Sequence, residues 1–238
     1  MTTIVTVVNK FDVFKSTIED NPFMQALPLQ VYDNTRENIT IPKRYNDFIE
    51  NHLPEDDWVV FCHQDFGFQE NIPSLVGKLD RNVIYGPIGA APTKQLVIVF
   101  ALSRYGVERS RIGIYPRSKL LGRITQSTSR KTRKMGQYLW RPAVVDTLDC
   151  CCLIVHSSLI KKHALRFDEY FDWHLYGEDF SLNARKKHQV LSKAVQIKCV
   201  HLSSGSVDLD FDARLNHLKK KYRTTAFATT CYDGYMRF

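Results

Sequence analysis

The chain has 238 residues, of which 33 are Lys or Arg and 25 are Asp or Glu, so its formal net charge is +8. This length fits one α/β domain with a sizeable core, and 44% hydrophobic with 24% charged residues is an ordinary globular composition that excludes a disordered chain. No apolar run approaches the roughly 20 residues of a membrane-spanning helix, and the first residues lack the layout of a signal peptide, so we expect a cytoplasmic protein.

The first half of the chain alternates β-branched runs with helical patterns. Strands are predicted at residues 3–8, 29–32, 58–62 and 83–85, and helices at 43–53 and 69–79. The strands are apolar on both faces, as in a central parallel sheet that helices cover. The alternation therefore predicts an open α/β sheet.

Polar residues follow three of these strands. Asn9 follows the first, Asp33 with Asn34 the second, and the triplet His63, Gln64 and Asp65 the third. Ligands of open α/β sheets bind outside the carboxyl ends of the strands, and a carboxylate there can hold a hard divalent cation. Turns also use Asn and Asp, and for Asn9 alone a turn is the preferred interpretation.

The positive charge is concentrated in residues 104–141. This segment has eleven basic residues and one acid, a charge of +10, so the rest of the chain has 22 basic against 24 acidic residues, a charge of −2. One interpretation is that its cations meet a diphosphate or an anionic membrane surface. The other is a solvated loop whose charge aids solubility.

The second half of the chain continues the α/β pattern. Strands are predicted at residues 149–155 and 195–201, and helices at 157–163, from about 178 to 187, and around 211–222. The first of these strands contains three adjacent cysteines, Cys150 to Cys152. Because the chain has no Cys-x-x-Cys pair, we expect them to be small buried residues and not a metal site or a disulfide framework.

Two further places could carry chemistry. Glu178 and Asp179 begin a helix directly after an aromatic stretch that contains Trp173 and His174. Such carboxylates either compensate the helix dipole or act as a general base towards a hydroxyl. His201 ends a strand, where it could ligate a metal or bond to a loop carbonyl.

The motifs together resemble a known family in order and spacing over about residues 3–205, apart from the basic segment. They are VYDN, RYNDFIE, WVVFCHQD, YGPIGA, VDTLDCCCLIVHSSLI, LRFDEYFDWHLYGEDFSLNAR and VHLSSGS. This set is similar to the nucleotide-sugar-dependent glycosyltransferases of the A-type fold, especially family-2-like bacterial enzymes of surface-polysaccharide synthesis.

The resemblance implies a single α/β glycosyltransferase domain with a mostly parallel central sheet flanked by helices. Residues 1–103 would form a Rossmann-like half that binds the nucleotide-sugar donor, and residues 104–141 the basic insert. Residues 142–205 would form the acceptor and catalytic half, and residues 206–238 a C-terminal helix and tail.

The resemblance also assigns roles to individual residues. Asp179 would be the base that deprotonates the acceptor, with Glu178 beside it, and Trp173 and His174 would contact the acceptor. Asp65 and His201 would hold Mn²⁺ or Mg²⁺ on the donor diphosphate. The donor, expected to be a UDP-sugar, would be contacted by Val8, Asn9, Asp33, Asn46, Gln64 and Gly86.

The resemblance further implies the reaction and the partners. One displacement at the anomeric carbon would invert its configuration, and the acceptor would be a saccharide or a lipid-linked sugar. The basic segment could then place the protein peripherally on an anionic membrane. One departure concerns the metal: the usual motif is Asp-x-Asp, and here His63 takes the first position, so only one carboxylate remains and the metal requirement stays open.

Two other classes of protein remain as alternatives. The first is a nucleic-acid-binding module, because basic clusters with nearby aromatic residues bind phosphates. The concentration of charge in one insert argues against it. The second is a glycosyltransferase-like binding protein without catalysis, against which the joint presence of Asp65, Glu178 and Asp179 argues.

Overall fold

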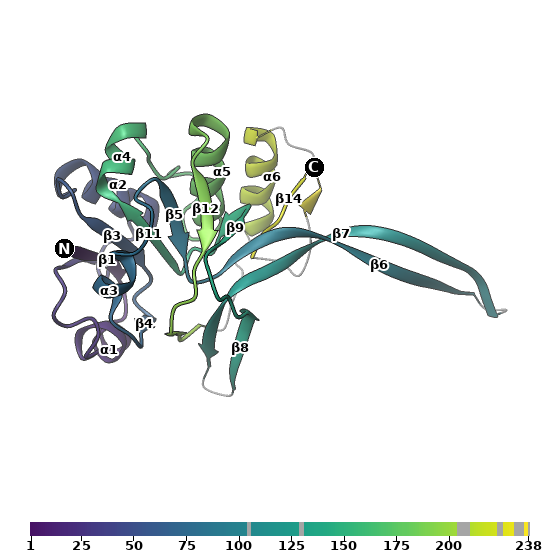
Figure 1. Ribbon diagram of the computed structural model, residues 1–238, viewed down its shortest axis with the longest axis horizontal. Helices are drawn as coiled ribbons and strands as arrows, with labels where there is room; N and C mark the ends of the chain where they lie inside the picture. Colours follow the sequence, from purple (N-terminus) through teal and green to yellow (C-terminus); the bar gives the residue numbers. More distant parts are fainter. Residues whose placement is uncertain (104–105, 129–130, 204–209, 223–225, 231–235, 238) are drawn as a thin grey trace.

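The computed structural model describes residues 1–103, 106–128, 131–203, 210–222, 226–230 and 236–237. For residues 94–103, 106–117, 226, 236 and 237 it describes the backbone alone. Two large sheets, a third sheet of two short strands, and several helices form the described part of the fold, and Figure 1 shows their arrangement.

The larger sheet has seven strands in the order β2-β1-β3-β11-β5-β12-β9. β1 pairs in parallel with β2 and with β3, and β5 pairs in parallel with β12. β11 is antiparallel to β3 and β5, and β9 is antiparallel to β12. All strands except β9 and β11 therefore point the same way, and the carboxyl ends of β1, β2 and β3 meet at one edge. The strands are β1 (Thr2–Val8), β2 (Leu29–Asp33), β3 (Trp58–Cys62), β5 (Val83–Gly86), β9 (Ala143–Val145), β11 (Cys152–His156) and β12 (Leu191–Ala194).

The second sheet has the order β10-β6-β7-β13-β4, and β8 pairs with β7 outside this path. Its longest members, β6 and β7, form an antiparallel hairpin that extends away from the rest of the molecule in Figure 1. The strands are β4 (Phe66–Phe68), β6 (Gly89–Ser103), β7 (Gly106–Ser127), β8 (Thr132–Gln137), β10 (Thr147–Leu148) and β13 (Cys199–His201). A short pair, β14 (Ala226–Phe227) and β15 (Met236–Arg237), lies near the C-terminal end.

Helices cover both faces of the larger sheet (Figure 1). One hydrophobic core joins the strands to α2, α4, α5 and α6, and a second joins them to α1, the π-helical turn η1 and α3. Alternate residues of one strand enter different cores: Val59 and Phe61 the first, Val60 and Cys62 the second. This explains why the strands are apolar on both faces. The helices are α1 (Phe11–Phe14), η1 (Lys15–Glu19), α2 (Ile41–Asn51), α3 (Ile72–Val76), α4 (Ser157–His163), α5 (Tyr176–His188) and α6 (Phe211–Tyr222).

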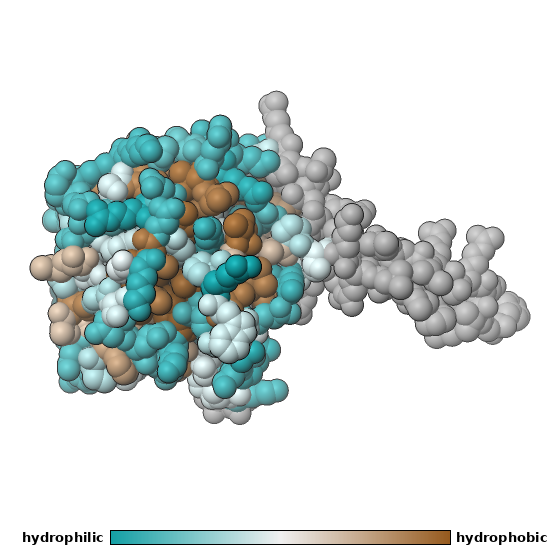
Figure 2. Space-filling model, in the orientation of Figure 1, coloured by the Kyte–Doolittle hydropathy of each residue, from teal (hydrophilic) through white to brown (hydrophobic). Residues whose placement is uncertain are grey.

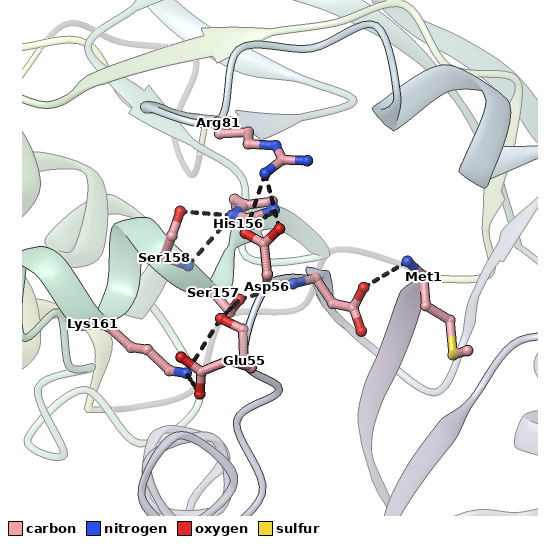
Figure 3. Close-up of polar contacts among 9 residues, drawn as sticks. Met1, Glu55, Asp56, Arg81, His156, Ser157, Ser158 and Lys161 are labelled. Atoms are coloured by element: carbon pink, nitrogen blue, oxygen red, sulfur yellow. Dashed lines mark hydrogen bonds and ion pairs between the residues drawn. The ribbon is translucent and has the colours of Figure 1, made fainter.

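The edge of the sheet where β3 begins carries a polar network, drawn in Figure 3. The Arg81 guanidinium lies 3.1 Å from both carboxylate oxygens of Asp56, and Lys161 contacts Glu55 at 2.7 Å. His156, at the end of β11, contacts the Ser158 hydroxyl at 2.7 Å. These contacts connect the loop before β3 to α4, at the opposite end of β3 from His63.

The predicted α/β fold is confirmed, and three predicted elements differ clearly from the structure. The helix predicted at residues 69–79 is shorter, because α3 spans Ile72–Val76. Residues 195–201 do not form one strand, because β12 ends at Ala194 and β13 begins at Cys199, in a different sheet. Val195, Ile197 and Cys199 are all buried, which explains why the segment has a strand-like pattern without a continuous ladder. The cysteine strand begins later than predicted, at Cys152, and all three adjacent cysteines are buried and free.

The surface that Figure 2 shows is mostly hydrophilic over the described residues, with apolar side chains in the recesses between polar ones. Within the part of the chain that the structure describes, no helix has the length and apolar character that crossing a membrane requires.

Candidate active site

A cleft lies where the predicted strand ends meet. Its lining comes from the ends of β1, β2 and β3, from α2, and from the segment before α5. The residues are Val7, Asn9, Asn34, Ile41, Tyr45, His63, Gln64, Asp65 and Trp173. The structure therefore brings together four of the predicted site residues: Asn9, Gln64, Asp65 and Trp173.

Gln64 joins the end of β3 to the end of β1. Its Oε1 accepts hydrogen bonds from the backbone N–H groups of Asn9 (3.0 Å) and Lys10 (2.9 Å), and its Nε2 donates to Asn9 Oδ1. Asn34, which the sequence placed with Asp33 after the second strand, lies beside them, and its buried Oδ1 has no hydrogen-bond partner among the described residues. An unsatisfied buried oxygen in a cleft is free to accept a bond from a ligand.

The other predicted donor residues lie outside the cleft lining. Val8 is fully buried, and Val7 lines the cleft in its place. Asp33 is exposed at the end of β2, where its carboxylate accepts two hydrogen bonds from Thr35 that lower its pKa. Asn46 is buried and bonds to the backbone of Phe167.

Gly86, the last of these residues, lies in β5. A Cβ at Gly86 would lie 2.9 Å from the backbone oxygen of Cys152, so the position requires glycine for packing.

A possible metal site lies at the junction of the two sheets. One ligand atom each of His63, Asp65 and His201 lies within 4.8 Å of the others. Asp65 stands between β3 and β4, and β13 pairs antiparallel with β4 so that His201 lies opposite Phe66. The backbone N–H of Leu202 also donates to Asp65 O at 2.8 Å. The chain thus brings a distant histidine to Asp65 through strand pairing.

The donor atoms of this cluster face one another. His63 Nδ1 lies 3.9 Å and His201 Nε2 lies 3.3 Å from Asp65 Oδ1. His201 Nε2 is buried and makes no hydrogen bond with acceptable geometry to a described residue. Two imidazoles, one with an unsatisfied nitrogen, and a carboxylate are a donor set that suits a divalent metal ion. These residues therefore fit the cation that the resemblance implies.

The pKa values of the three residues in this cluster shift in different directions. Burial lowers the pKa of His63, which favours the neutral imidazole that metal ligation needs. Burial also acts to lower the pKa of His201, but the Asp65 carboxylate raises it more. Burial acts to raise the pKa of Asp65, but the two histidines lower it by more, so the carboxyl stays ionised.

Asp179 lies in the first turn of α5 and is almost fully buried. Its Oδ1 is 2.6 Å from Lys221 Nζ and 2.7 Å from the Tyr222 hydroxyl, both at the end of α6. Its Oδ2 is buried without a hydrogen-bond partner among the described residues. Burial raises its pKa, and the ammonium of Lys221 only partly offsets this. A carboxylate with raised pKa and a free oxygen can accept a proton.

Glu178 is fully buried beside Asp179 but faces other partners. Its Oε1 accepts bonds of 3.2 Å from the hydroxyls of Thr229 and Thr230, and the Cys150 thiol lies 3.4 Å from Oε2. These contacts connect α5 to the segment after β14.

Several residues of this region were not expected from the sequence. Lys221 also contacts Asp168 at 2.7 Å, so one ammonium bridges two carboxylates. The Tyr176 hydroxyl lies 2.5 Å from His63 Nε2. Burial acts to lower the pKa of both site histidines, and Asp149 is among the groups that oppose this effect. The signal available for Tyr176 was its place directly before Gly177, Glu178 and Asp179; nothing in the sequence placed Lys221 near Asp179.

Predicted acceptor residues occupy the segment before α5. Trp173 lines the cleft, and the His174 ring lies 5.8 Å from that of Phe211 in α6. Leu175 follows with a left-handed backbone (φ 64°) and a fully buried side chain. A bulky residue rarely adopts this conformation, and here it sets the direction in which α5 begins.

The basic segment contributes the second strand of the hairpin and β8. β7 pairs in parallel with β13, placing Gln126 opposite His201, and Gln126 Oε1 accepts two bonds from the Arg133 guanidinium. Lys131, Arg133 and Lys134 are exposed. Arg104 and Arg130 lie outside the described residues, as do the side chains of Arg109, Arg111 and Arg117. Part of the basic segment is thus attached to the strand that carries His201.

Comparison with solved structures finds a similar fold in S. aureus TarS. A structure of TarS residues 1–349 matches with a TM-score of 0.52 and 11% sequence identity, over 92% of this chain and 64% of that one. Another TarS structure matches with a TM-score of 0.51 and 10% identity, over 92% of this chain and 39% of that one. No protein-family model and no curated protein matches the sequence. At this identity the likeness concerns the fold: the chain has the mixed α/β fold of TarS and spans about two thirds or less of its length.

Proposed function

We propose that the protein is an inverting glycosyltransferase that moves a sugar from a nucleoside-diphosphate sugar, a UDP-sugar, to an acceptor hydroxyl in surface glycan synthesis. The observation that carries this proposal is that the first turn of α5 connects the possible metal site to a buried carboxylate. Tyr176 contacts His63 of the possible metal site, and Asp179 lies three residues further on. The sequence resemblance and the fold shared with TarS support the same activity.

The donor is proposed to bind in the cleft at the ends of β1, β2 and β3. Asn9 and Gln64 hold the strand ends together, and the free Oδ1 of Asn34 can accept a bond from the nucleotide. This is the crevice in which open α/β sheets bind nucleotides. His63, Asp65 and His201 line or adjoin it and would hold the cation.

A divalent cation bound there would offset the negative charge that grows on the departing diphosphate. Gln126 lies opposite His201 on the neighbouring strand and accepts a hydrogen bond from Arg133. Arg133 therefore offers a further positive charge near this region. The protein therefore needs no nucleophile of its own, and its remaining task is to orient the acceptor and remove a proton.

Asp179 is proposed to remove that proton. Its Oδ1 is held by Lys221 and Tyr222, which leaves Oδ2 to accept the proton of the acceptor hydroxyl. The acceptor oxygen then forms a bond to the anomeric carbon as the bond from that carbon to the diphosphate oxygen breaks. The electron pair leaves with the nucleoside diphosphate, and attack from the opposite face inverts the configuration.

The basic segment is proposed to contact the anionic surface on which a lipid-linked acceptor would lie. Lys131, Arg133 and Lys134 are exposed, and the Trp140 side chain is 93% exposed with its ring 5.0 Å from that of Tyr138. Cations attract acidic lipids, and exposed aromatic rings are favoured at the lipid headgroup level.

A panel of nucleotide sugars, tested with Mn²⁺, checks this function. One member should raise the thermal unfolding temperature, since a ligand present at about 1,000 times its Kd stabilises a protein by about 4 kcal/mol. The same member should be converted slowly to the nucleoside diphosphate. If no nucleotide sugar of the panel stabilises the protein, the proposed donor class is wrong.

A further inference from the structure

The His63 ring has different partners at its two nitrogens. Nε2 lies 2.5 Å from the Tyr176 hydroxyl, whereas Nδ1 lies 3.9 Å from Asp65 Oδ1. The Tyr176 hydroxyl also donates a hydrogen bond of 3.1 Å to the backbone oxygen of Cys150. In a neutral imidazole only one nitrogen carries a hydrogen. The hydrogen bonds that the partners can accept or donate determine which nitrogen it is.

The two partners of the Tyr176 hydroxyl favour one tautomer of His63. A tyrosine hydroxyl has one proton, and a backbone carbonyl can only accept. If the Tyr176 proton goes to Cys150 O, the hydroxyl oxygen must accept from His63, so Nε2 carries the hydrogen. Both contacts are then satisfied. The lone pair of His63 is consequently on Nδ1, the nitrogen that faces Asp65.

This tautomer completes a set of three electron-pair donors. The lone pair on His63 Nδ1 and the carboxylate of Asp65 face each other without a proton between them. The buried His201 Nε2 lies 3.3 Å from Asp65 Oδ1 and makes no hydrogen bond with acceptable geometry to a described residue. Imidazole nitrogens suit transition metals, whereas Mg²⁺ prefers a shell of oxygen atoms. A site with two imidazoles and one carboxylate should therefore bind a divalent transition-metal ion more tightly than Mg²⁺.

We propose that Tyr176 is a positioning residue that holds His63 with Nδ1 directed at Asp65, and that the resulting site binds a divalent transition-metal ion in preference to Mg²⁺. This inference rests on the proposed function, because it takes the cluster as the cation site of that function. Tyr176 is suited to the role because it is fully buried in the first turn of α5 and also fixed by Cys150.

The test uses Co²⁺ as the probe, on the full chain without nucleotide. Co²⁺ binding is followed by its visible absorption, which reports nitrogen ligands, and Mg²⁺ is added as competitor. Wild type should bind Co²⁺ and retain it in a hundredfold excess of Mg²⁺. Tyr176→Phe should weaken Co²⁺ binding by about 10- to 100-fold, the usual effect of losing a partner that orients a metal ligand.

Tyr85→Phe is the matched control. Tyr85 is also a buried tyrosine, and its hydroxyl accepts a hydrogen bond from the backbone N–H of Asp80, away from the cluster. Removing that hydroxyl should leave the affinity and the spectrum of bound Co²⁺ unchanged. An equal loss of affinity in both variants would mean a general effect on packing and would contradict the role of Tyr176.

Nitrogen-15 NMR of the wild-type histidines without metal reads the tautomer directly and does not depend on how a variant folds. The His63 signals should be those of the Nε2–H form, and in Tyr176→Phe the Nδ1–H form should appear. A wild-type His63 in the Nδ1–H form, or Mg²⁺ that displaces Co²⁺ at equal concentration, would overturn the inference. Selective Co²⁺ binding by a protein that binds no nucleotide sugar would instead contradict the proposed function alone.

Discussion

Lys221 Nζ lies 2.6 Å from Oδ1 of Asp179, so the end of α6 holds the carboxylate that we propose as the catalytic base. The ammonium is at the same time 2.7 Å from Asp168. Burial raises the pKa of Asp179, and Lys221 counteracts part of this effect. Without the ammonium the pKa would be higher still.

Lys221→Met should move the acid limb of the pH profile of sugar transfer to higher pH. Asp179 must be ionised to accept a proton, so activity falls as the pH decreases through its pKa. Removing the ammonium, which lies 2.6 Å from the carboxylate, raises that pKa because the ionised form loses an opposite charge. Lys220→Met, on the exposed side of the same helix, is the control. If the acid limb lay at the same pH in both variants, Lys221 would not lower the pKa of the catalytic base.

Asp179→Asn should reduce turnover by about 10²- to 10⁴-fold, the usual contribution of a general base, and leave nucleotide affinity within a few-fold of wild type. Rates and nucleotide titrations measured side by side separate the two effects. Asp212→Asn, an exposed position in the first turn of α6, should change neither. Turnover of Asp179→Asn within a few-fold of wild type would show that another group takes the proton.

Gly177→Ala should destabilise the protein by about 1–3 kcal/mol, because an added methyl group has no space there. Its Cβ would lie 3.0 Å from Cys150 N and 3.1 Å from Leu148 O, both backbone atoms. Chemical denaturation measures the change. Gly77→Ala is the control, since its Cβ would meet Pro73 O at 3.4 Å. Equal stability of the two variants would contradict the tight packing of α5 on Cys150.

Neutralising Arg130, Lys131, Arg133 and Lys134 together should reduce co-sedimentation with vesicles that contain acidic lipids. The attraction amounts to about 1 kcal/mol per basic residue near such a surface, so the loss should be large and should disappear in high salt. A control variant neutralises four exposed lysines elsewhere: Lys43, Lys78, Lys162 and Lys187. Equal sedimentation of wild type and the first variant would refute membrane contact through this segment.

The central sheet and the edge that carries the cleft were predictable from local patterns. Apolar runs ending in Asn9, Asp33 and His63 predicted β1 to β3, and parallel strands place such ends together. The failure at residues 195–201 has a physical cause: burial of alternate residues does not require a hydrogen-bonded ladder. Periodicity therefore identified buried residues there and overestimated the strand.

The contacts across the site were less accessible to sequence reasoning. The helical pattern of residues 211–222 predicted α6, but it could not show that Lys221 and Tyr222 reach Asp179, because that depends on how α6 packs on α5. Tyr176 and His63 are 113 residues apart, and only the folded chain brings them together. The β6–β7 hairpin was not predicted, because the charge of residues 104–141 indicates only an insert. The apolar run LVIVFAL before Gly106 is nevertheless typical of a strand.

The most direct test of the proposed activity is calorimetric titration of the stabilising nucleotide sugar into wild type and Asp65→Ala, with Mn²⁺ and with chelator. The account predicts that wild type binds at least tenfold more tightly with Mn²⁺ and that Asp65→Ala loses this difference. Asp56→Ala, whose carboxylate pairs with Arg81 at the opposite end of β3 (Figure 3), should behave as wild type. Equal affinity of wild type with Mn²⁺ and with chelator would contradict a metal-assisted donor site at His63, Asp65 and His201.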